Sequence, residues 1–398
     1  MTEHPLLRKA DLPLEVVILL IAGMMMLITG ALLFPVSEGA LPYYENGLYG
    51  SLLVIFALQI ITLGKTPYGD LPRSKPLLAA GVVVAAAGIV TCFVPDLLST
   101  LPRILLFLFL GPGSFLLLVN MCFAKEKLPA WIKYGGIFRH LIFACGAVYI
   151  LSMLIALMIW KQSLLTVPMT AGVVLIYGTA LVYLAFVLRK IYRMHPEADR
   201  LPEGDGELST DQAMLLLMAI FMVLLGVLLI PVNLGLLPFS GSAQLGLLMV
   251  IFAVQMLASG NTPIGPFPRS WLMIFSGLLF AALGIESCII PGILVPYLTV
   301  LVGVLNILGG VVSLWKIGSS RQRESEGTGD PLSTLLKKLS AAQLTMSLLT
   351  ILFGASMLVS HLIPGLIIGV VLAANGCALL YLIHGMMLLD KLQRAQTS

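Results

Sequence analysis

Gly64-Lys65-Thr66-Pro67-Tyr68-Gly69-Asp70-Leu71-Pro72-Arg73-Ser74 recurs in the chain as Gly260-Asn261-Thr262-Pro263-Ile264-Gly265-Pro266-Phe267-Pro268-Arg269-Ser270. The second copy begins 196 residues after the first. At the same offset, residues 50–95 match residues 246–291 without a gap, with 21 of 46 positions identical. Apolar composition alone does not give this level of identity, so we interpret the chain as a tandem duplication.

The composition is that of a protein solvated by lipid. Hydrophobic residues make up 59% of the chain and charged residues 11%, whereas an ordinary soluble domain is about 25% charged. Apolar runs of about 20 residues recur along the whole length, and each is long enough to cross a hydrocarbon core of roughly 30 Å as a helix. The chain leaves no room for a soluble domain between these runs.

The sequence predicts an all-α polytopic membrane protein with about 12 transmembrane helices, arranged as two parallel six-helix repeats of three helical hairpins each. Within a hairpin, proline and glycine favour tight turns between antiparallel helices. The predicted spans are 13–35, 46–64, 76–98, 101–123, 138–160, 164–188, 212–233, 241–259, 272–293, 295–316, 337–361 and 363–388.

The predicted domains are a first six-span repeat at residues 1–192, a cytoplasmic linker at 193–211 and a second six-span repeat at 212–398. The polar composition of the linker is typical of a flexible connection. Because six is an even number of spans, both repeats enter the membrane from the same side. Such repeats are related by an axis along the membrane normal.

Basic residues define the expected orientation, because cytoplasmic loops collect Lys and Arg. An N-terminus on the cytoplasmic side puts 21 of the 23 basic residues there and leaves only Arg103 and Lys161 on the other face. We therefore expect a multi-pass protein with both termini cytoplasmic. Adding or removing one span would destroy this asymmetry, so the charge pattern also supports the number of spans.

The hairpins share a pattern of a glycine-bearing apolar helix closed by proline. Examples are AGMMMLITGALLFP at 22–35, AAGVVVAAAGIVTCFVP at 79–95, LMAIFMVLLGVLLIP at 217–231 and FSGLLFAALGIESCIIP at 275–291. Three such hairpins in six spans resemble the HdeD family of bacterial inner-membrane proteins, and the chain is similar to two such units in tandem. The resemblance implies a protein of the bacterial inner membrane that is associated with acid stress.

Arg73 and Arg269 occupy equivalent positions in the duplicated loops. In one interpretation they belong to a turn, in which proline fixes φ, glycine permits positive φ and arginine anchors the loop at the lipid headgroups. In the other they flank a pseudo-symmetric cytoplasmic mouth and bind an anion or an anionic headgroup. The loop lacks the spacing of a nucleotide-binding phosphate loop.

Three polar residues inside predicted spans are candidates for function. Glu286 is the acid placed deepest in a span, and an ionisable group in hydrocarbon is a functional candidate by default. Its counterpart is Val90, so the role of Glu286 is not repeated in the first half. Gln59 and Gln255 are equivalent to each other, and they either form interhelical hydrogen bonds or line a polar path.

No catalytic, cofactor or metal motif is expected. The five cysteines have no CxxC or Cys/His spacing, so neither a zinc site nor a disulfide framework is indicated. We predict no cofactor and no enzymatic activity. The expected partners are membrane lipids and either another membrane protein or further copies of this chain, and not nucleic acid.

Two functions remain open from the sequence. The first is a non-enzymatic membrane protein of HdeD type that contributes to stress tolerance by organising lipid, blocking leak or docking a partner. The alternative is a transporter or channel for a small solute or ion, with Glu286, Gln59 and Gln255 as lining. Paired broken helices would favour transport, but only the fourth span carries Gly111-Pro112-Gly113, without a matching proline in the tenth.

Overall fold

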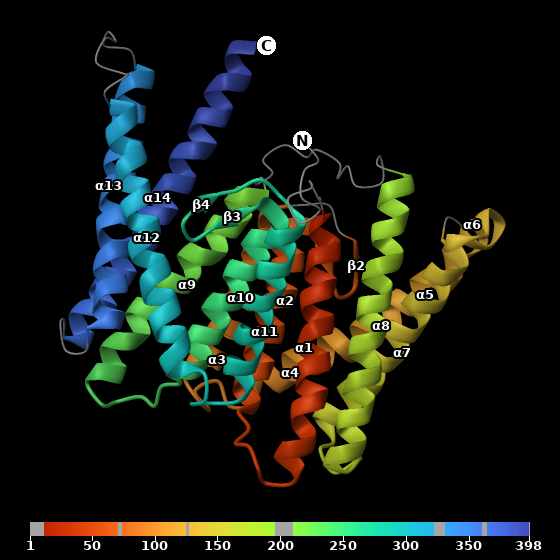
Figure 1. The fold of residues 1–398 in the computed structure, drawn as a ribbon. Coiled ribbons are helices and arrows are strands. Elements are labelled where there is room, and N and C mark those ends of the chain that lie inside the picture. The colour runs from red at the N-terminus through yellow and green to blue at the C-terminus, as the bar shows by residue number, and fades with distance from the viewer. Residues whose placement is uncertain are drawn as a thin grey trace, which may run out of the picture. The chain divides into compact units, whose positions relative to one another are not determined.

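The structure is a computed structural model that describes residues 12–70, 74–124, 127–195, 210–321, 331–359 and 364–397. Within these residues, twelve helices are long and apolar enough to cross a membrane. They coincide with the twelve predicted spans to within a few residues at most ends. The all-α membrane fold is therefore confirmed, and Figure 1 shows the helices in chain order.

Where the structure describes the connections, most helices are joined by short turns, and two of these turns are β-hairpins. The helices are α1 (Leu14–Ser37), α2 (Glu45–Leu63), α3 (Lys75–Phe93), α4 (Leu101–Leu108), the π-helix η2 (Phe109–Gly113), α5 (Ser114–Phe123), α6 (Leu128–Tyr134), α7 (Ile137–Trp160), α8 (Val167–Met194), α9 (Thr210–Asn233), α10 (Gly241–Ser259), α11 (Trp271–Ile289), α12 (Val295–Arg321), α13 (Pro331–Leu358) and α14 (Gly365–Thr397). The strands are β1 (Lys65–Thr66), β2 (Gly69–Asp70), β3 (Asn261–Thr262) and β4 (Gly265–Pro266).

By its contacts the chain forms two compact units. The first contains the described parts of Met1–Glu207, Ser240–Gly260 and Pro268–Leu294, that is, α1 to α8 together with α10 and α11. In this unit α1 packs along α8, α2 along α3 and α10 along α11. Thus α10 and α11, which follow the predicted linker, pack in the same unit as the helices that precede it.

The second unit contains Leu208–Phe239, Asn261–Phe267 and the described part of Val295–Ser398. Here α9 packs along α14, α12 along α13, and α13 along α14. A Cβ atom at Gly226 of α9 would lie 2.4 Å from the Ala373 backbone nitrogen of α14, so these two helices touch through their backbones. Most of the predicted linker at 193–211 lies outside the described residues, and the limits of the two sequence repeats remain a prediction.

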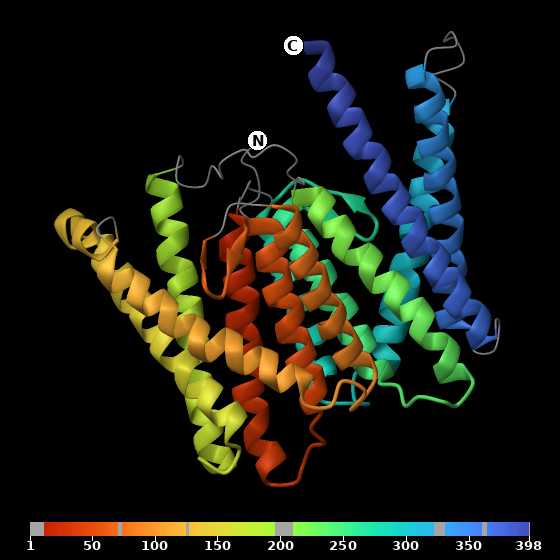
Figure 2. The same ribbon diagram turned by 180° about the vertical axis from the view of Figure 1, so that it is seen from behind.

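The fourth span is interrupted at the predicted place. The π-helix η2 contains Pro112 and joins α4 to α5, and a proline inside a helix removes a backbone hydrogen bond and favours such a bulge. Figure 2 shows α4, η2 and α5 following one another along a tilted rod. The corresponding helix α12 runs from Val295 to Arg321 as one α-helix.

Candidate functional site

The two duplicated loops form β-hairpins with the same pairing. Lys65 pairs with Asp70 in the first hairpin, and Asn261 pairs with Pro266 in the second. Each hairpin follows a helix that ends at a left-handed glycine, Gly64 with φ of 65° or Gly260 with φ of 74°. Glycine adopts this conformation without a steric penalty, and it turns the chain out of α2 and α10 into the strands.

The threonine of each loop holds its turn closed. The Thr66 hydroxyl donates to the Gly69 carbonyl oxygen at 2.7 Å, and the Thr262 hydroxyl donates to the Gly265 carbonyl oxygen at the same distance. After each loop a serine begins the next helix, as Ser270 Oγ accepts from the Met273 amide at 3.3 Å. This is N-capping, which satisfies an amide that has no partner within the helix. The local structure therefore supports the interpretation of these residues as turn residues.

Each loop also packs on a glycine of a later helix in its own unit. A Cβ atom at Gly113 would lie 2.7 Å from the Pro67 carbonyl oxygen, and one at Gly309 would lie 2.0 Å from the Pro263 carbonyl oxygen. Gly113 and Gly309 are 196 residues apart, as are Pro67 and Pro263. The proline carbonyl of each loop therefore lies directly against a helix, at a position where any side chain larger than that of glycine would overlap it.

A polar pair ties each loop to the start of a long helix. The Lys65 ammonium lies 2.6 Å from the Glu15 carboxylate of α1, which also accepts a hydrogen bond from the Tyr192 hydroxyl of α8. In the other copy, the Asn261 amide donates to the Asp211 carboxylate of α9 at 3.3 Å. The position of the contact is the same in both copies, but only the first is an ion pair.

Arg269 donates a hydrogen bond to the carbonyl oxygen of Ala258, in the last turn of α10. Carbonyls in the last turn of a helix lack partners within the helix, and a cation there interacts favourably with the helix dipole. This contact ties Arg269 to the end of α10, and its anchoring at the lipid headgroups remains a prediction. Arg73 lies outside the described residues, and the proposed binding of an anion by the two arginines remains a prediction.

Two backbone hydrogen bonds join the hairpin α2–α3 to the hairpin α10–α11. The Tyr44 amide, just before α2, donates to the Ile289 carbonyl at the end of α11, and the Ser240 amide, just before α10, donates to the Phe93 carbonyl at the end of α3. Both bonds measure 2.9 Å. The beginnings of α2 and α10 therefore lie at the same end of the unit, so the two hairpins run in the same direction.

Glycines bring the four helices of these two hairpins, α2, α3, α10 and α11, into backbone contact; we call them the central helices. A Cβ atom at Gly50 of α2 would lie 2.4 Å from the Gly88 carbonyl oxygen of α3, and one at Gly246 of α10 would lie 2.5 Å from the Gly284 carbonyl oxygen of α11. Between the hairpins, a Cβ atom at Gly47 would lie 1.9 Å from the Cys288 carbonyl oxygen. Small residues drive this kind of close packing in lipid.

Glu286 lies near the end of α11, three residues before Ile289, and is half-buried. Its carboxylate forms no hydrogen bond or ion pair within the described part of the chain. Its backbone carbonyl accepts from the Ile290 amide at 2.8 Å, which closes the helix. The structure thus places the acid close to the end at which the two hairpins are joined.

Gln59 and Gln255 lie near the opposite ends of α2 and α10 and are also half-buried. Each lies 15 residues after the residue at which its hairpin is joined to the other, Tyr44 or Ser240. At a rise of 1.5 Å per residue, about 18 Å along the helix axes separates this level from that of Glu286. The three candidates therefore do not form one binding site.

A polar cluster that the sequence did not predict surrounds Glu45, the first residue of α2. Arg103 Nη2 lies 3.2 and 3.4 Å from the two carboxylate oxygens, and Gln162 Nε2 lies 3.1 Å from one of them. The Tyr49 hydroxyl also donates to this carboxylate. The only signal in the sequence was the position of Arg103 among the few basic residues on the face opposite to the predicted cytoplasmic side. The cluster ties α4 and the turn after α7 to α2.

Among the described residues, no group of three His, Cys, Asp or Glu side chains is placed to hold a metal ion, and the five cysteines are free thiols. In comparisons with protein-family models, with curated proteins and with solved structures, none matched the chain.

Proposed function

We propose that this protein is a non-enzymatic integral membrane protein of HdeD type, which supports acid or stress tolerance as a rigid membrane scaffold. In this proposal it organises lipid or docks a partner and does not move a solute. The backbone-level packing of the central helices carries the proposal. Helix α2 touches α3 at Gly50, α10 touches α11 at Gly246, and α2 touches α11 at Gly47.

This packing supports a closed core within the first unit, because a water molecule or an ion needs a gap several ångströms wide between helices. A glycine whose missing side chain would already overlap a neighbouring carbonyl leaves no such gap at that level. Interfaces of small residues in membrane proteins are held by van der Waals contact, which requires that they stay closed. A scaffold benefits from this rigidity, whereas a carrier has to open its core.

The location and the stress role come from the resemblance and from the charge pattern. We place the protein in a bacterial inner membrane with both termini cytoplasmic, because this orientation puts 21 of the 23 basic residues on the cytoplasmic side. The acid-stress role follows from the likeness of the glycine-bearing hairpins to the HdeD pattern. The proposed partners are lipids and another membrane protein or a second copy of the chain.

Flux measurements on the purified full chain in liposomes test the proposal. We expect fluxes of protons, K⁺, Na⁺, Cl⁻ and a panel of small neutral solutes equal to those of protein-free liposomes. The measurement is made at pH 7 and at pH 5, since the resemblance points to acid. A flux well above that of empty liposomes that Glu286→Gln abolishes would contradict the scaffold and establish transport.

A transporter or channel for a small solute or ion is the second candidate, and one observation favours it. The π-helix η2 interrupts the regular α-helix of the fourth span around Pro112. Such π-bulges are frequent at functional sites, and interrupted helices mark the binding sites of many transporters. Restoring a regular helix with Pro112→Ala separates the two functions. A carrier would lose activity, whereas a scaffold would keep its fold and show no flux before or after the change.

A further inference from the structure

Arg189, near the end of α8, is a half-buried cation that has no counter-ion among the residues that the structure describes. Its guanidinium carbon lies 5.1 Å from the centre of the Trp271 ring, at the start of α11. Its Nε atom is buried and has no hydrogen-bond partner in the described residues. Leaving a charged donor desolvated and unpaired is costly, so an anion at the remaining guanidinium nitrogens would stabilise this arrangement.

Within the described part of the chain, the surroundings of Arg189 add positive charge and no unpaired acid. Arg193 follows one helical turn later in α8 and is exposed, and α8 itself contains no acidic residue. The carboxylate of Glu15, at the start of α1, is already bound by Lys65 and by Tyr192. The end of α8 therefore presents at least two arginines with no acidic partner in the described residues.

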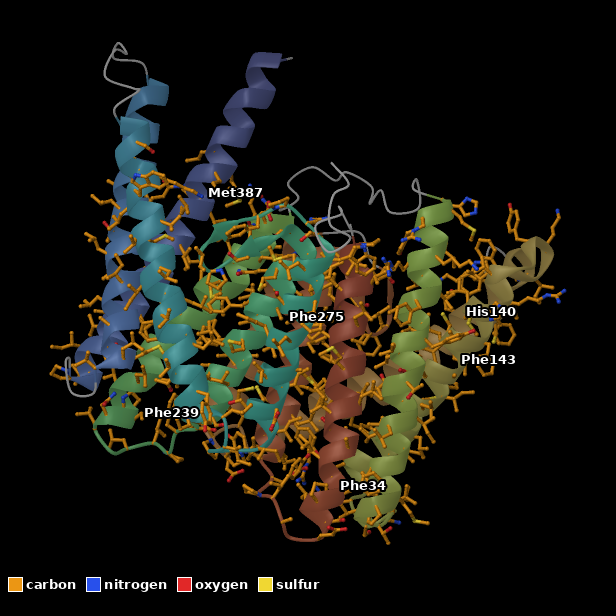
Figure 3. The ribbon with its side chains drawn as sticks, in the orientation of Figure 1. Phe34, His140, Phe143, Phe239, Phe275 and Met387 are labelled. Carbon is orange, nitrogen blue, oxygen red and sulfur yellow. The ribbon has the colours of Figure 1, made fainter. Side chains whose placement is uncertain are left out.

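An apolar strip of α11 begins directly at the aromatic partner of Arg189. Trp271, Phe275 and Leu279 are spaced by four residues, so they lie on one face of the helix, and all three are exposed. Phe275 is labelled in Figure 3 and is 67% exposed. A tryptophan at the level of the headgroups with apolar side chains below it is typical of the boundary of a membrane.

We propose that Arg189, Arg193 and Trp271 form a binding site for an anionic glycerophospholipid, whose phosphate is held by the two arginines and whose acyl chain lies along Trp271, Phe275 and Leu279. The guanidinium group suits this ligand because its planar donors match phosphate oxygens. The cation–π contact with Trp271 holds the fork in place. The adjoining apolar strip favours a lipid over a free phosphate. The site is independent of whether the protein is a scaffold or a carrier.

Lipid retention by the purified full chain tests the site. The protein in detergent is mixed with phosphatidylglycerol or phosphatidylcholine, and bound lipid is counted by native mass spectrometry. We expect the wild type to retain phosphatidylglycerol at least tenfold better than phosphatidylcholine. The double variant Arg189→Gln/Arg193→Gln is expected to lose this preference, since each basic residue near anionic lipid contributes about fivefold.

A matched control removes two exposed basic residues elsewhere in the same unit, as Lys133→Gln/Arg139→Gln. This control is expected to keep the preference within threefold. Arg189→Lys keeps the charge but loses the planar fork, and it is expected to fall between wild type and the double variant. If the double variant fails to fold, the exposed Arg193→Gln alone is expected to reduce the preference by about fivefold.

Three results would overturn the proposal. The first is an unchanged preference in both Arg193→Gln and the double variant. The second is an equal loss in the Lys133/Arg139 control, because the effect would then belong to the total charge. The third is competition by millimolar inorganic phosphate or by glycerophosphoglycerol, the headgroup without acyl chains, because the ligand would then be a soluble phosphate.

Discussion

The Tyr44 amide donates a hydrogen bond of 2.9 Å to the Ile289 carbonyl oxygen, and so joins the beginning of α2 to the end of α11. The bond from Ser240 to Phe93 repeats it 196 residues later with the roles of the two hairpins exchanged. Backbone bonds of this kind do not depend on side chains, so sequence divergence between the copies leaves them in place. They fix the hairpins α2–α3 and α10–α11 side by side in the same direction.

The glycine contacts between central helices should be sensitive to a single methyl group. We expect Gly50→Ala and Gly246→Ala each to lower the free energy of unfolding by about 1–3 kcal/mol, because the added Cβ overlaps a backbone carbonyl that cannot move freely. Gly146→Ala and Gly172→Ala are the controls, since a Cβ atom at either position meets nothing within 4 Å. Unfolding in mixed micelles measures the difference, and equal effects at all four glycines would refute the close contact.

The loops should loosen when the glycines beneath them are enlarged. Gly309→Ala places a Cβ atom 2.0 Å from the Pro263 carbonyl oxygen, and the loop must move to accommodate it. We expect faster proteolysis at residues 261–267 with little change in the stability of the helices. Gly318→Ala is the control, because Gly318 lies in the same helix but faces open space. This variant is expected to be cleaved at residues 261–267 at the wild-type rate. Equally fast cleavage in Gly318→Ala and Gly309→Ala would show that the effect of Gly309→Ala is not local.

The pair of Glu15 and Lys65 should contribute modestly to stability. A double-mutant cycle with Glu15→Gln and Lys65→Met is expected to give a coupling free energy of about 0.5–1 kcal/mol, because both groups are partly exposed. The coupling should fall when the salt concentration is raised from 0.05 to about 0.5 M, as expected for screened charges. In the second copy, Asn261→Ala and Asp211→Asn should give a coupling that does not change with salt, and equal salt dependence in both cycles would contradict the assignment.

Alkaline pH should reduce the contribution of the Tyr44 phenol to stability. Its hydroxyl donates to the Cys92 carbonyl oxygen at 3.1 Å, and burial raises the pKa of the Tyr44 phenol above its ordinary value. The folded state thus favours the neutral phenol, and its contribution is present below pH of about 10 and is lost at higher pH. We expect wild type to lose stability between pH 9 and 11 more steeply than Tyr44→Phe. Parallel pH profiles would show that Tyr44 titrates normally.

The helices could be predicted from the sequence because each span is a long apolar run. In lipid, every backbone group of such a run has to be paired within the helix itself. The turn in each loop was also predictable from local residues, since Gly64 and Pro67 have strong conformational preferences of their own. The interruption of the fourth span was visible in Gly111-Pro112-Gly113 for the same reason. The pairing of the two short strands was not predicted.

Contacts between distant segments were not predictable in this way. The backbone hydrogen bonds donated by the Tyr44 and Ser240 amides do not depend on any side chain, so no residue pattern predicts them. The ion pair of Glu45 with Arg103 joins residues 58 positions apart. Glu286 was identified by its charge, but its distance along the helices from Gln59 depends on how α2 and α11 are aligned. A single sequence contains no direct record of that alignment.

Cysteine accessibility tests the parallel arrangement of the two hairpins most directly. In a chain without its five native cysteines, Tyr68→Cys and Phe267→Cys place a thiol in each duplicated loop, and Leu97→Cys and Ile293→Cys place one at each opposite turn; all four native side chains are exposed. Right-side-out and inverted vesicles are treated with a membrane-impermeant maleimide. We expect positions 68 and 267 to react together in inverted vesicles, and positions 97 and 293 to react together in right-side-out vesicles. Reaction of 68 and 267 in opposite preparations would contradict the parallel arrangement.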